Sequence, residues 1–315
     1  MSEFDLIRRY FTRPTPGAIL GVGDDAALLH VQDGMELAVS TDMLVSGTHF
    51  LPDTDPFLLG HKTLAVNLSD LAAMGAIPRW ATLALSLPHA DEDWLRRFSE
   101  GFYILAGEHG VELVGGDTTR GPLSLSVTIM GEVPRGQALR RSGAEVGDDI
   151  WVSGTLGNAA LGLAYLQGQV VPTQDARAAG LAALHQPQPR VALGLALRGV
   201  ASSAIDISDG LLADLGHILE CSHAGAELEF DKIPARMPSG IEEGLLRHCV
   251  LSGGDDYELC FTVPASRRSQ VAAIAERLQL PLTRIGSISS GTDCTVRSKD
   301  GDAMTIKENG YDHFA

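Results

Sequence analysis

The stretch Asn67-Leu68-Ser69-Asp70-Leu71-Ala72-Ala73-Met74-Gly75 predicts the last turns of an apolar helix. The pair Asp55-Pro56 supplies an N-cap and a first helical residue, and the final glycine of the stretch stops the helix. The helix is apolar on nearly all sides, so we expect it to be buried. Asp70 lies inside it, with Asn67 one turn earlier on the same face. A buried carboxylate needs a partner, so Asp70 is either a capping or ion-pair residue or a metal ligand.

Size and charge restrict the class of protein. The chain has 315 residues, enough for two domains with their own cores, and its 44% hydrophobic content is that of a globular protein. Its net charge is −16, from 40 acidic and 24 basic residues. This balance argues against nucleic acid as a partner, because such a partner requires a basic surface. An anionic substrate would need cations to bridge it to the protein.

The cysteines and the N-terminus predict a cytoplasmic protein. The four cysteines show no CxxC spacing, so neither a zinc site nor a disulfide framework is indicated, and free thiols fit a reducing compartment. The first residues lack the basic and apolar regions of a signal peptide. No apolar run reaches membrane-spanning length, so we expect no membrane partner.

The order of elements predicts an α/β (α+β) fold in two domains, residues 1–137 and 148–315, separated by a glycine-rich segment of mixed charge. Near the N-terminus we expect a hairpin of strands 26–31 and 36–41, with Asp42 at its end. A second helix should run from Asp91 to Gly110. Further strands are expected near 81–87, 111–114, 123–133, 150–153, 203–207, 226–230 and 257–263, and further helices at 208–221 and 266–278.

Aspartates recur where a strand ends or a glycine turn begins. Besides Asp70, they are Asp24, Asp25, Asp42, Asp117, Asp206, Asp209, Asp255 and Asp256. Any single one is ordinary turn chemistry. If several converge, they cannot all remain ionised without a counterion. Mg²⁺ prefers such hard oxygen ligands and usually joins a few carboxylates to substrate phosphates. The pattern therefore predicts a Mg²⁺–nucleotide site.

Commoner nucleotide and cation motifs fit poorly. Residues 21–26 match the dinucleotide pattern GxGxxA, but an expected hairpin follows where that motif requires a helix. The chain has no Gly-Lys-Ser/Thr and hence no Walker P-loop. Residues 206–210 suggest an EF-hand loop, but their glycine falls one place early.

Other residues allow two interpretations each. Residues 115–119 form either a plain loop or a loop whose N–H groups bind phosphate. Arg120, Arg140 and Arg141 either hold phosphate oxygens or are solvated. His49 either contacts substrate or lies in a loop, and Tyr311 either stacks on a ring or anchors the tail.

Nine motifs, in order along nearly the whole chain, resemble those of the thiamine-monophosphate kinase family. They are residues 23–26, 40–42, 49–50, 67–75, 115–119, 153–155, 206–211, 253–259 and 310–314. The resemblance implies a two-domain aminoimidazole ribonucleotide synthetase-like fold, a fold group shared with selenophosphate synthetase. It also implies an N-terminal ATP- and Mg²⁺-binding domain whose sheet pairs across a homodimer, and a C-terminal α/β domain that completes the active site. The implied reaction is ATP-dependent phosphorylation of thiamine monophosphate, the final step of thiamine diphosphate biosynthesis.

The resemblance also implies residue roles. The Mg²⁺ ligands would be Asp25, Ser40, Thr41, Asp42, Asp70, Asp117, Asp206 and Asp209. The ATP contacts would be Gly116, Asp117, Arg141 and Ser208, and the thiamine monophosphate contacts His49, Asp255 and Tyr311. One departure is Asp255, where the family usually has Glu. Its side chain is one methylene shorter, so the resemblance implies substrate binding by Asp255 less strongly than by His49 and Tyr311.

The chemistry of this acceptor needs no general base, because a phosphate oxygen is already ionised near neutral pH. We expect direct in-line transfer carried by the metal ligands Asp42, Asp70, Asp117 and Asp206. Two alternatives stay open. One is a ring-closing ATP ligase of the aminoimidazole ribonucleotide synthetase type. The other is a non-catalytic nucleotide-binding maturation partner, although that relative works through a C-terminal cysteine and this chain ends in alanine.

Overall fold

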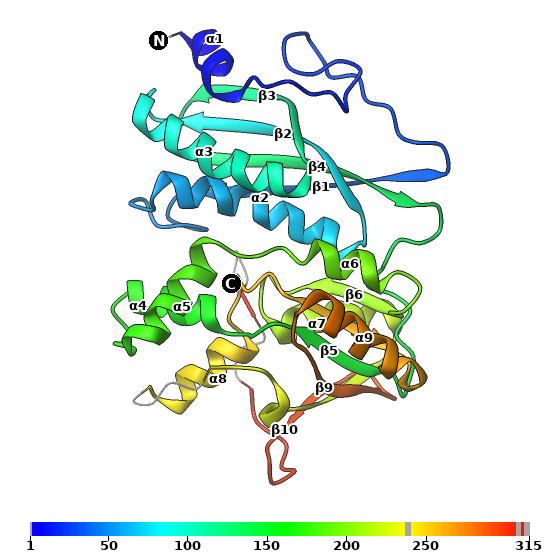
Figure 1. Cartoon of the computed structure of the whole chain (residues 1–315). Coiled ribbons are helices and arrows are strands. Elements are labelled where there is room, and N and C mark those ends of the chain that lie inside the picture. The colour runs from blue at the N-terminus through cyan, green and yellow to red at the C-terminus, as the bar shows by residue number, and fades with distance from the viewer. Residues whose placement is uncertain (1, 237–240, 307–309, 312–315) are drawn as a thin grey trace. The chain divides into compact units, whose positions relative to one another are not determined.

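The structure is a computed structural model that describes residues 2–236, 241–306 and 310–311. The chain divides into two compact units (Figure 1). Unit 1 comprises Met1–Leu71 and Ala76–Gly136, and unit 2 comprises Ala72–Gly75 and Gln137–Ala315. Each unit contains one sheet and its own helices, so the expected α/β fold with one sheet in each half is confirmed. No helix in the described part of the chain is both long and apolar enough to cross a membrane.

Unit 1 is built on a four-stranded sheet with the strand order β1-β4-β2-β3. Its strands are β1 (Met35–Val45), β2 (Ile77–Leu87), β3 (Glu112–Arg120) and β4 (Ser124–Pro134). The pairs β1–β4 and β4–β2 are antiparallel, and β2–β3 is parallel. Consequently β1 and β3 form the two edges of the sheet. A short helix α1 (Glu3–Leu6) and the π-helical turn Ile7–Phe11 precede the sheet in the chain.

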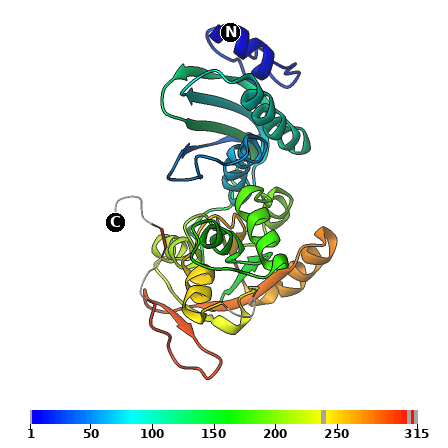
Figure 2. The same cartoon turned by 90° about the vertical axis from the view of Figure 1, so that its left-hand side faces the viewer.

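Helices α2 (Pro56–Ala73) and α3 (Glu92–His109) pack against the same face of this sheet (Figures 1 and 2). Their predicted ends are confirmed. Asp55 Oδ1 accepts a hydrogen bond from Phe57 N at the start of α2, and Gly75 follows its end in the left-handed conformation. The two helices approach closely, because a Cβ added to Gly101 of α3 would lie 1.9 Å from the Phe57 carbonyl oxygen.

Two sequence predictions about strands in unit 1 are wrong. Residues 26–31 form no strand; Leu28 makes an isolated bridge to Leu20, and β1 pairs with β4 over its whole length instead. Asp42 therefore lies inside a strand and not at its end. Residues 115–119 belong to β3 and not to a loop, because β3 stays paired with β2 as far as Arg120. Gly116 permits this pairing, since a Cβ there would lie 1.9 Å from the Leu83 carbonyl oxygen.

Unit 2 contains a six-stranded mixed sheet with the order β10-β7-β9-β5-β8-β6. Its strands are β5 (Asp149–Ser153), β6 (Ser203–Asp206), β7 (Gly225–Glu229), β8 (Leu259–Val263), β9 (Leu282–Ser289) and β10 (Cys294–Arg297). Its helices are α4 (Asn158–Leu166), α5 (Gln174–His185), α6 (Val191–Leu197), α7 (Leu211–Ser222), α8 (Glu243–Leu251) and α9 (Arg268–Leu278). The apolar side chains of α7, among them Leu211, Leu215 and Ile218, join those of the strands in one buried core. The sheet and this core fix the loop between β6 and α7.

Candidate active site

The first group of predicted site residues lies between β1 and α2. The Ser40 hydroxyl donates a hydrogen bond to Asp70 Oδ2, and Asp42 N donates to Asn67 Oδ1 over 3.2 Å. Side chains alternate along a strand, so Ser40 and Asp42 lie on the face of β1 that meets α2. Thr41 lies on the other face, where its Oγ1 is 2.8 Å from the Oγ1 of Thr128. The side chain of Thr41 therefore faces away from Asp70, and its role as a further ligand stays a prediction.

Asp70 differs from its neighbours in exposure. Residues 59–69 and 71–73 of α2 are all buried, as predicted, whereas Asp70 is partly exposed. Leu68 and Leu71 are 0% and 1% exposed on either side of it. The helix thus holds one carboxylate at the edge of an otherwise buried surface, where a cation from solvent can reach it without the cost of full burial.

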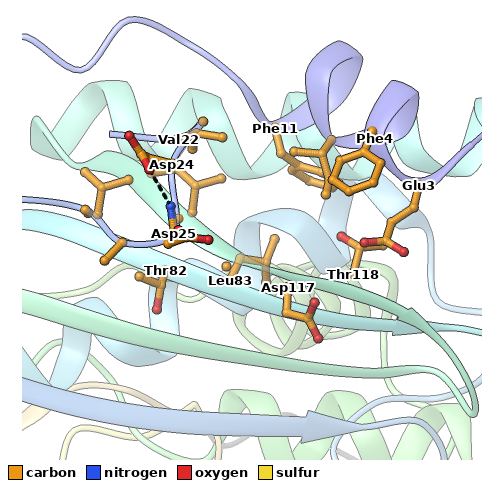
Figure 3. Close-up of a pocket in the computed structure, with 18 residues that line it drawn as sticks. Glu3, Phe4, Phe11, Val22, Asp24, Asp25, Thr82, Leu83, Asp117 and Thr118 are labelled. Carbon is orange, nitrogen blue, oxygen red and sulfur yellow. Dashed lines mark hydrogen bonds between the residues drawn. The ribbon is translucent and has the colours of Figure 1, made fainter. Parts of the chain in front are cut away.

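The second group lines a cavity of about 670 Å³ beside the edge strand β3. Asp24, Asp25, Gly116 and Asp117 contribute to its wall, so three of the residues predicted as Mg²⁺ or ATP contacts come together here. Figure 3 shows the rings of Phe4 and Phe11 together on one side of this cavity, with Glu3 beside Phe4, and Asp24 and Asp25 on the other side. The cavity therefore combines a pair of aromatic rings with several carboxylates.

The third group lies in unit 2, in the loop between β6 and α7. Asp206, which is 6% exposed, ends β6, and Asp209 is partly exposed three residues later. Sequence analysis missed the residue that shapes this loop, Asp214 of α7. Its Oδ2 accepts hydrogen bonds from the backbone N–H groups of residues 208, 209 and 210 at 3.0, 3.0 and 3.1 Å. Burial, and then the carboxylates of Asp206 and Asp209, raise the pKa of Asp214 to about 7.

The predicted substrate contacts of unit 2 attach to the same loop. Asp255 N donates to the Ser208 carbonyl over 2.8 Å, and Tyr311 N donates to the Asp209 carbonyl over 3.0 Å. Asp255 has φ = 70°, in the left-handed region. Asp adopts this conformation more readily than most residues. Of the tail motif 310–314, Gly310 and Tyr311 lie within the described residues.

The other two acids of the 253–259 motif hold the fold together. Asp256 Oδ2 accepts a hydrogen bond from Gly157 N at 2.8 Å and so caps the start of α4, while burial raises the pKa of Asp256 well above its usual range. Glu258 is 6% exposed; it accepts hydrogen bonds from the Ser153 hydroxyl and from the Arg190 guanidinium. Both carboxylates accept hydrogen bonds from other parts of unit 2, so we assign both to structure.

His49 and Arg141 complete the predicted set. His49 Nδ1 accepts a hydrogen bond from Val45 N over 3.0 Å, which fixes the imidazole in the turn after β1 and leaves Nε2 as the protonated nitrogen of the neutral ring. Arg141 lies in the connection from Gln137 to β5 of unit 2, where it is exposed, and its carbonyl accepts a hydrogen bond from the Ser222 hydroxyl. Both residues lie in surface turns, where a ligand can reach them.

The Mg²⁺ prediction can be tested against the donor sets. Across residues 2–236, 241–306 and 310–311, no three His, Cys, Asp or Glu side chains are close enough together to hold a metal ion. The predicted ligands lie instead in three separate groups: Asp42 and Asp70 on β1 and α2, Asp25 and Asp117 around the cavity together with Asp24, and Asp206 at the end of β6 with Asp209 in the loop after it. Mg²⁺ keeps several waters and commonly binds one or two carboxylates together with substrate phosphates. Small groups of carboxylates, whose oxygens are hard ligands, fit that mode of binding.

Comparison with known proteins identifies both halves of the chain. Residues 23–133 match the N-terminal domain of AIR synthase related protein, and residues 145–299 match its C-terminal domain. Among curated proteins, the thiamine-monophosphate kinase of Salmonella typhimurium is 48% identical over 319 residues, which cover 99% of this chain and 98% of that protein.

Solved structures agree with the sequence comparison. The crystal structure of thiamine-monophosphate kinase from Stenotrophomonas maltophilia is 51% identical, with a TM-score of 0.85 over 96% of each chain. A structure of AaThiL complexed with AMPPCP and TMP is 29% identical, with a TM-score of 0.76 over 98% of this chain and 95% of that one. The two-domain fold implied by the sequence motifs is thereby confirmed. This chain belongs to the thiamine-monophosphate kinase family.

Proposed function

We propose that this protein transfers the γ-phosphoryl group of ATP to the phosphate of thiamine monophosphate, giving ADP and thiamine diphosphate, the final step of thiamine diphosphate biosynthesis. The observation that carries this function is the 48% identity with a curated thiamine-monophosphate kinase over 98% of its length. The AaThiL structure with AMPPCP and TMP supports binding of the same two substrates here.

The cavity beside β3 is the proposed nucleotide site of unit 1. Its apolar side, with Phe4 and Phe11, suits a purine ring, and its acidic side suits phosphates neutralised by cations. Gly116 lines this cavity next to Asp117, and its main chain is a proposed contact to the phosphates. Arg141 and the hydroxyl of Ser208 in unit 2 are the remaining proposed ATP contacts. His49, Asp255 and Tyr311 are the proposed contacts to thiamine monophosphate.

Mg²⁺ is the proposed metal, held by the carboxylates of Asp25, Asp42, Asp70, Asp117, Asp206 and Asp209, with Ser40 and Thr41 as further oxygen ligands. When bound, Mg²⁺ would neutralise and orient the two polyanionic substrates. The protein's own part is to hold these carboxylates on rigid elements. The acceptor oxygen is already ionised, so no side chain need remove a proton, and we propose direct in-line transfer.

A homodimer is the proposed assembly, with β1 at the interface. Leu37, Val39 and Met43 alternate along the outer face of this edge strand, and they are 45%, 57% and 57% exposed. Adjacent exposed apolar residues on an edge strand favour pairing with another chain. In this proposal unit 1 dimerises and binds ATP with Mg²⁺, and unit 2 completes the site. The four unpaired cysteines support a cytoplasmic location.

One assay separates this function from its alternatives. Purified protein is incubated with ATP, Mg²⁺ and thiamine monophosphate, and the products are identified by ³¹P NMR. Thiamine diphosphate and ADP in equal amounts are expected. A ring-closing ligase or a non-catalytic nucleotide-binding protein would form no thiamine diphosphate. With ATP chiral at the γ-phosphorus, inversion of configuration is expected, and retention would contradict direct transfer.

A further inference from the structure

Asp214 is not one of the proposed ligands or substrate contacts, yet its side chain holds the loop that carries Ser208 and Asp209. The side chain is 3% exposed and projects from the first turn of α7 back toward the loop that precedes the helix. A single oxygen, Oδ2, accepts the N–H groups of three consecutive residues, Ser208, Asp209 and Gly210. Three consecutive N–H groups at a helix start form a concave site for an anion, and here the anion is the protein's own carboxylate.

The carbonyl groups of the same loop point elsewhere and hold the predicted substrate contacts. The Ser208 carbonyl accepts the N–H of Asp255, and the Asp209 carbonyl accepts the N–H of Tyr311. Gly310 lies against the loop as well, because a Cβ added to it would come within 2.5 Å of the Ala213 Cβ and 2.9 Å of the Asp209 carbonyl oxygen. The loop therefore joins a proposed metal ligand to two proposed substrate contacts through its main chain.

We propose that Asp214 is a positioning residue: by holding the N–H groups of residues 208–210, it sets the placement of the Asp209 carboxylate and of the segments that carry Asp255 and Tyr311. This inference rests on the proposed function for the roles of those three residues. It goes further in assigning their placement to a fourth residue, the buried Asp214. Because the N–H groups before α7 already donate to Asp214, they are not open to a nucleotide phosphate. The group that Ser208 can offer to a nucleotide is therefore its hydroxyl.

The test is a graded series of substitutions at Asp214 with a matched control. Asp214→Ala removes the acceptor and leaves three buried N–H groups without it, and Asp214→Asn keeps the volume with a weaker, neutral acceptor. The control is Asp148→Ala. Asp148 is 5% exposed, also in unit 2, and its Oδ2 accepts hydrogen bonds from Glu145 N and the Ser202 hydroxyl at 3.1 and 2.5 Å. The two alanine variants thus remove carboxylates of similar burial from the same unit.

Three quantities are measured for each full-length variant: the melting temperature, the Kd for Mn²⁺ by electron paramagnetic resonance, and the KM for thiamine monophosphate. For Asp214→Ala we expect the Kd and the KM each to rise about tenfold, the factor that corresponds to one ordinary hydrogen bond. Asp214→Asn should recover most of both affinities. Asp148→Ala should lower the melting temperature and leave both affinities unchanged.

Wild-type Mn²⁺ affinity and KM in a folded Asp214→Ala would overturn the proposal, and so would equal shifts in Asp148→Ala. If Asp214→Ala does not fold, Asp214→Asn is judged by the same two affinities. If neither folds, Asp214 supports the unit as a whole and the proposal is overturned. A wild-type protein without kinase activity would contradict the proposed function, whereas the Mn²⁺ affinities would still judge the role of Asp214.

Discussion

Replacing Asp70 by Asn separates its structural and metal-binding roles, because the two roles predict effects of different size. The amide has nearly the same volume as the carboxylate, and its oxygen can still accept the hydrogen bond from the Ser40 hydroxyl. Only the charge is lost, at a position that is partly exposed. The free energy of unfolding should therefore fall by no more than about 1 kcal/mol. The hydrogen bond between Asp42 N and Asn67 Oδ1 does not involve Asp70 and should persist.

The effect on turnover should be much larger if Asp70 binds a metal. Losing a charged ligand that helps to stabilise the transition state should cost about 3–4 kcal/mol, which lowers kcat by about 10²–10³-fold. The assay is the initial rate at saturating ATP and thiamine monophosphate over a series of Mg²⁺ concentrations, with calorimetry on the same samples. Ser40→Ala is the matched control, since it removes the hydroxyl and keeps the charge, and its kcat should fall far less.

Two outcomes would refute this interpretation of Asp70. A folded Asp70→Asn protein with wild-type kcat and wild-type Mg²⁺ dependence would remove Asp70 from the metal ligands. A protein that fails to fold would make Asp70 a structural carboxylate of α2.

Two further predictions concern stability and thiol chemistry. Gly101→Ala should destabilise the protein by about 1–3 kcal/mol, because its Cβ would clash with the Phe57 carbonyl. In the same helix, a Cβ at Gly107 meets no atom within 4 Å, so Gly107→Ala should stabilise the protein by about 0.5–1 kcal/mol. Denaturant titration measures both changes in the free energy of unfolding. In the native protein at pH 8 a thiol reagent should modify exposed Cys221 rapidly, whereas Cys249, whose pKa burial raises to about 11, should react only on unfolding. Rapid native labelling of Cys249 would contradict its burial.

The ends of helices were predictable because helix capping is local. Asp91 caps α3 by accepting hydrogen bonds from the N–H groups of Asp93 and Trp94, and Gly110 ends the helix in the left-handed conformation. The pair Asp55-Pro56 starts α2 in the same local way. Each signal lies within a few residues of the boundary that it sets, so one sequence was sufficient.

Strand partners were not predictable in the same way, because pairing connects distant segments. The alternating pattern of residues 36–41 correctly predicted a strand, but it carried no information about β4, which lies almost 90 residues further along. The glycines of residues 115–119 suggested a loop, although Gly116 serves a close approach to β2. A glycine required by a neighbouring strand looks the same in sequence as a glycine required by a turn.

The functions of the carboxylates show where sequence patterns stop being informative. Asp209 and Asp214 both lie in or next to the motif 206–211, and Asp255 and Asp256 are neighbours. In the structure, the carboxylates of Asp214 and Asp256 accept backbone N–H groups, whereas the main chains of Asp209 and Asp255 hold neighbouring segments: the Asp209 carbonyl accepts from Tyr311 N, and Asp255 N donates to the Ser208 carbonyl. A carboxylate whose oxygens already accept backbone N–H groups has less capacity left for a cation. Asp214 and Asp256 therefore use their carboxylates to hold the backbone of unit 2. A chain that places several acids near one site needs such residues, because the ligand carboxylates repel one another and only rigid loops keep them in place before a cation arrives.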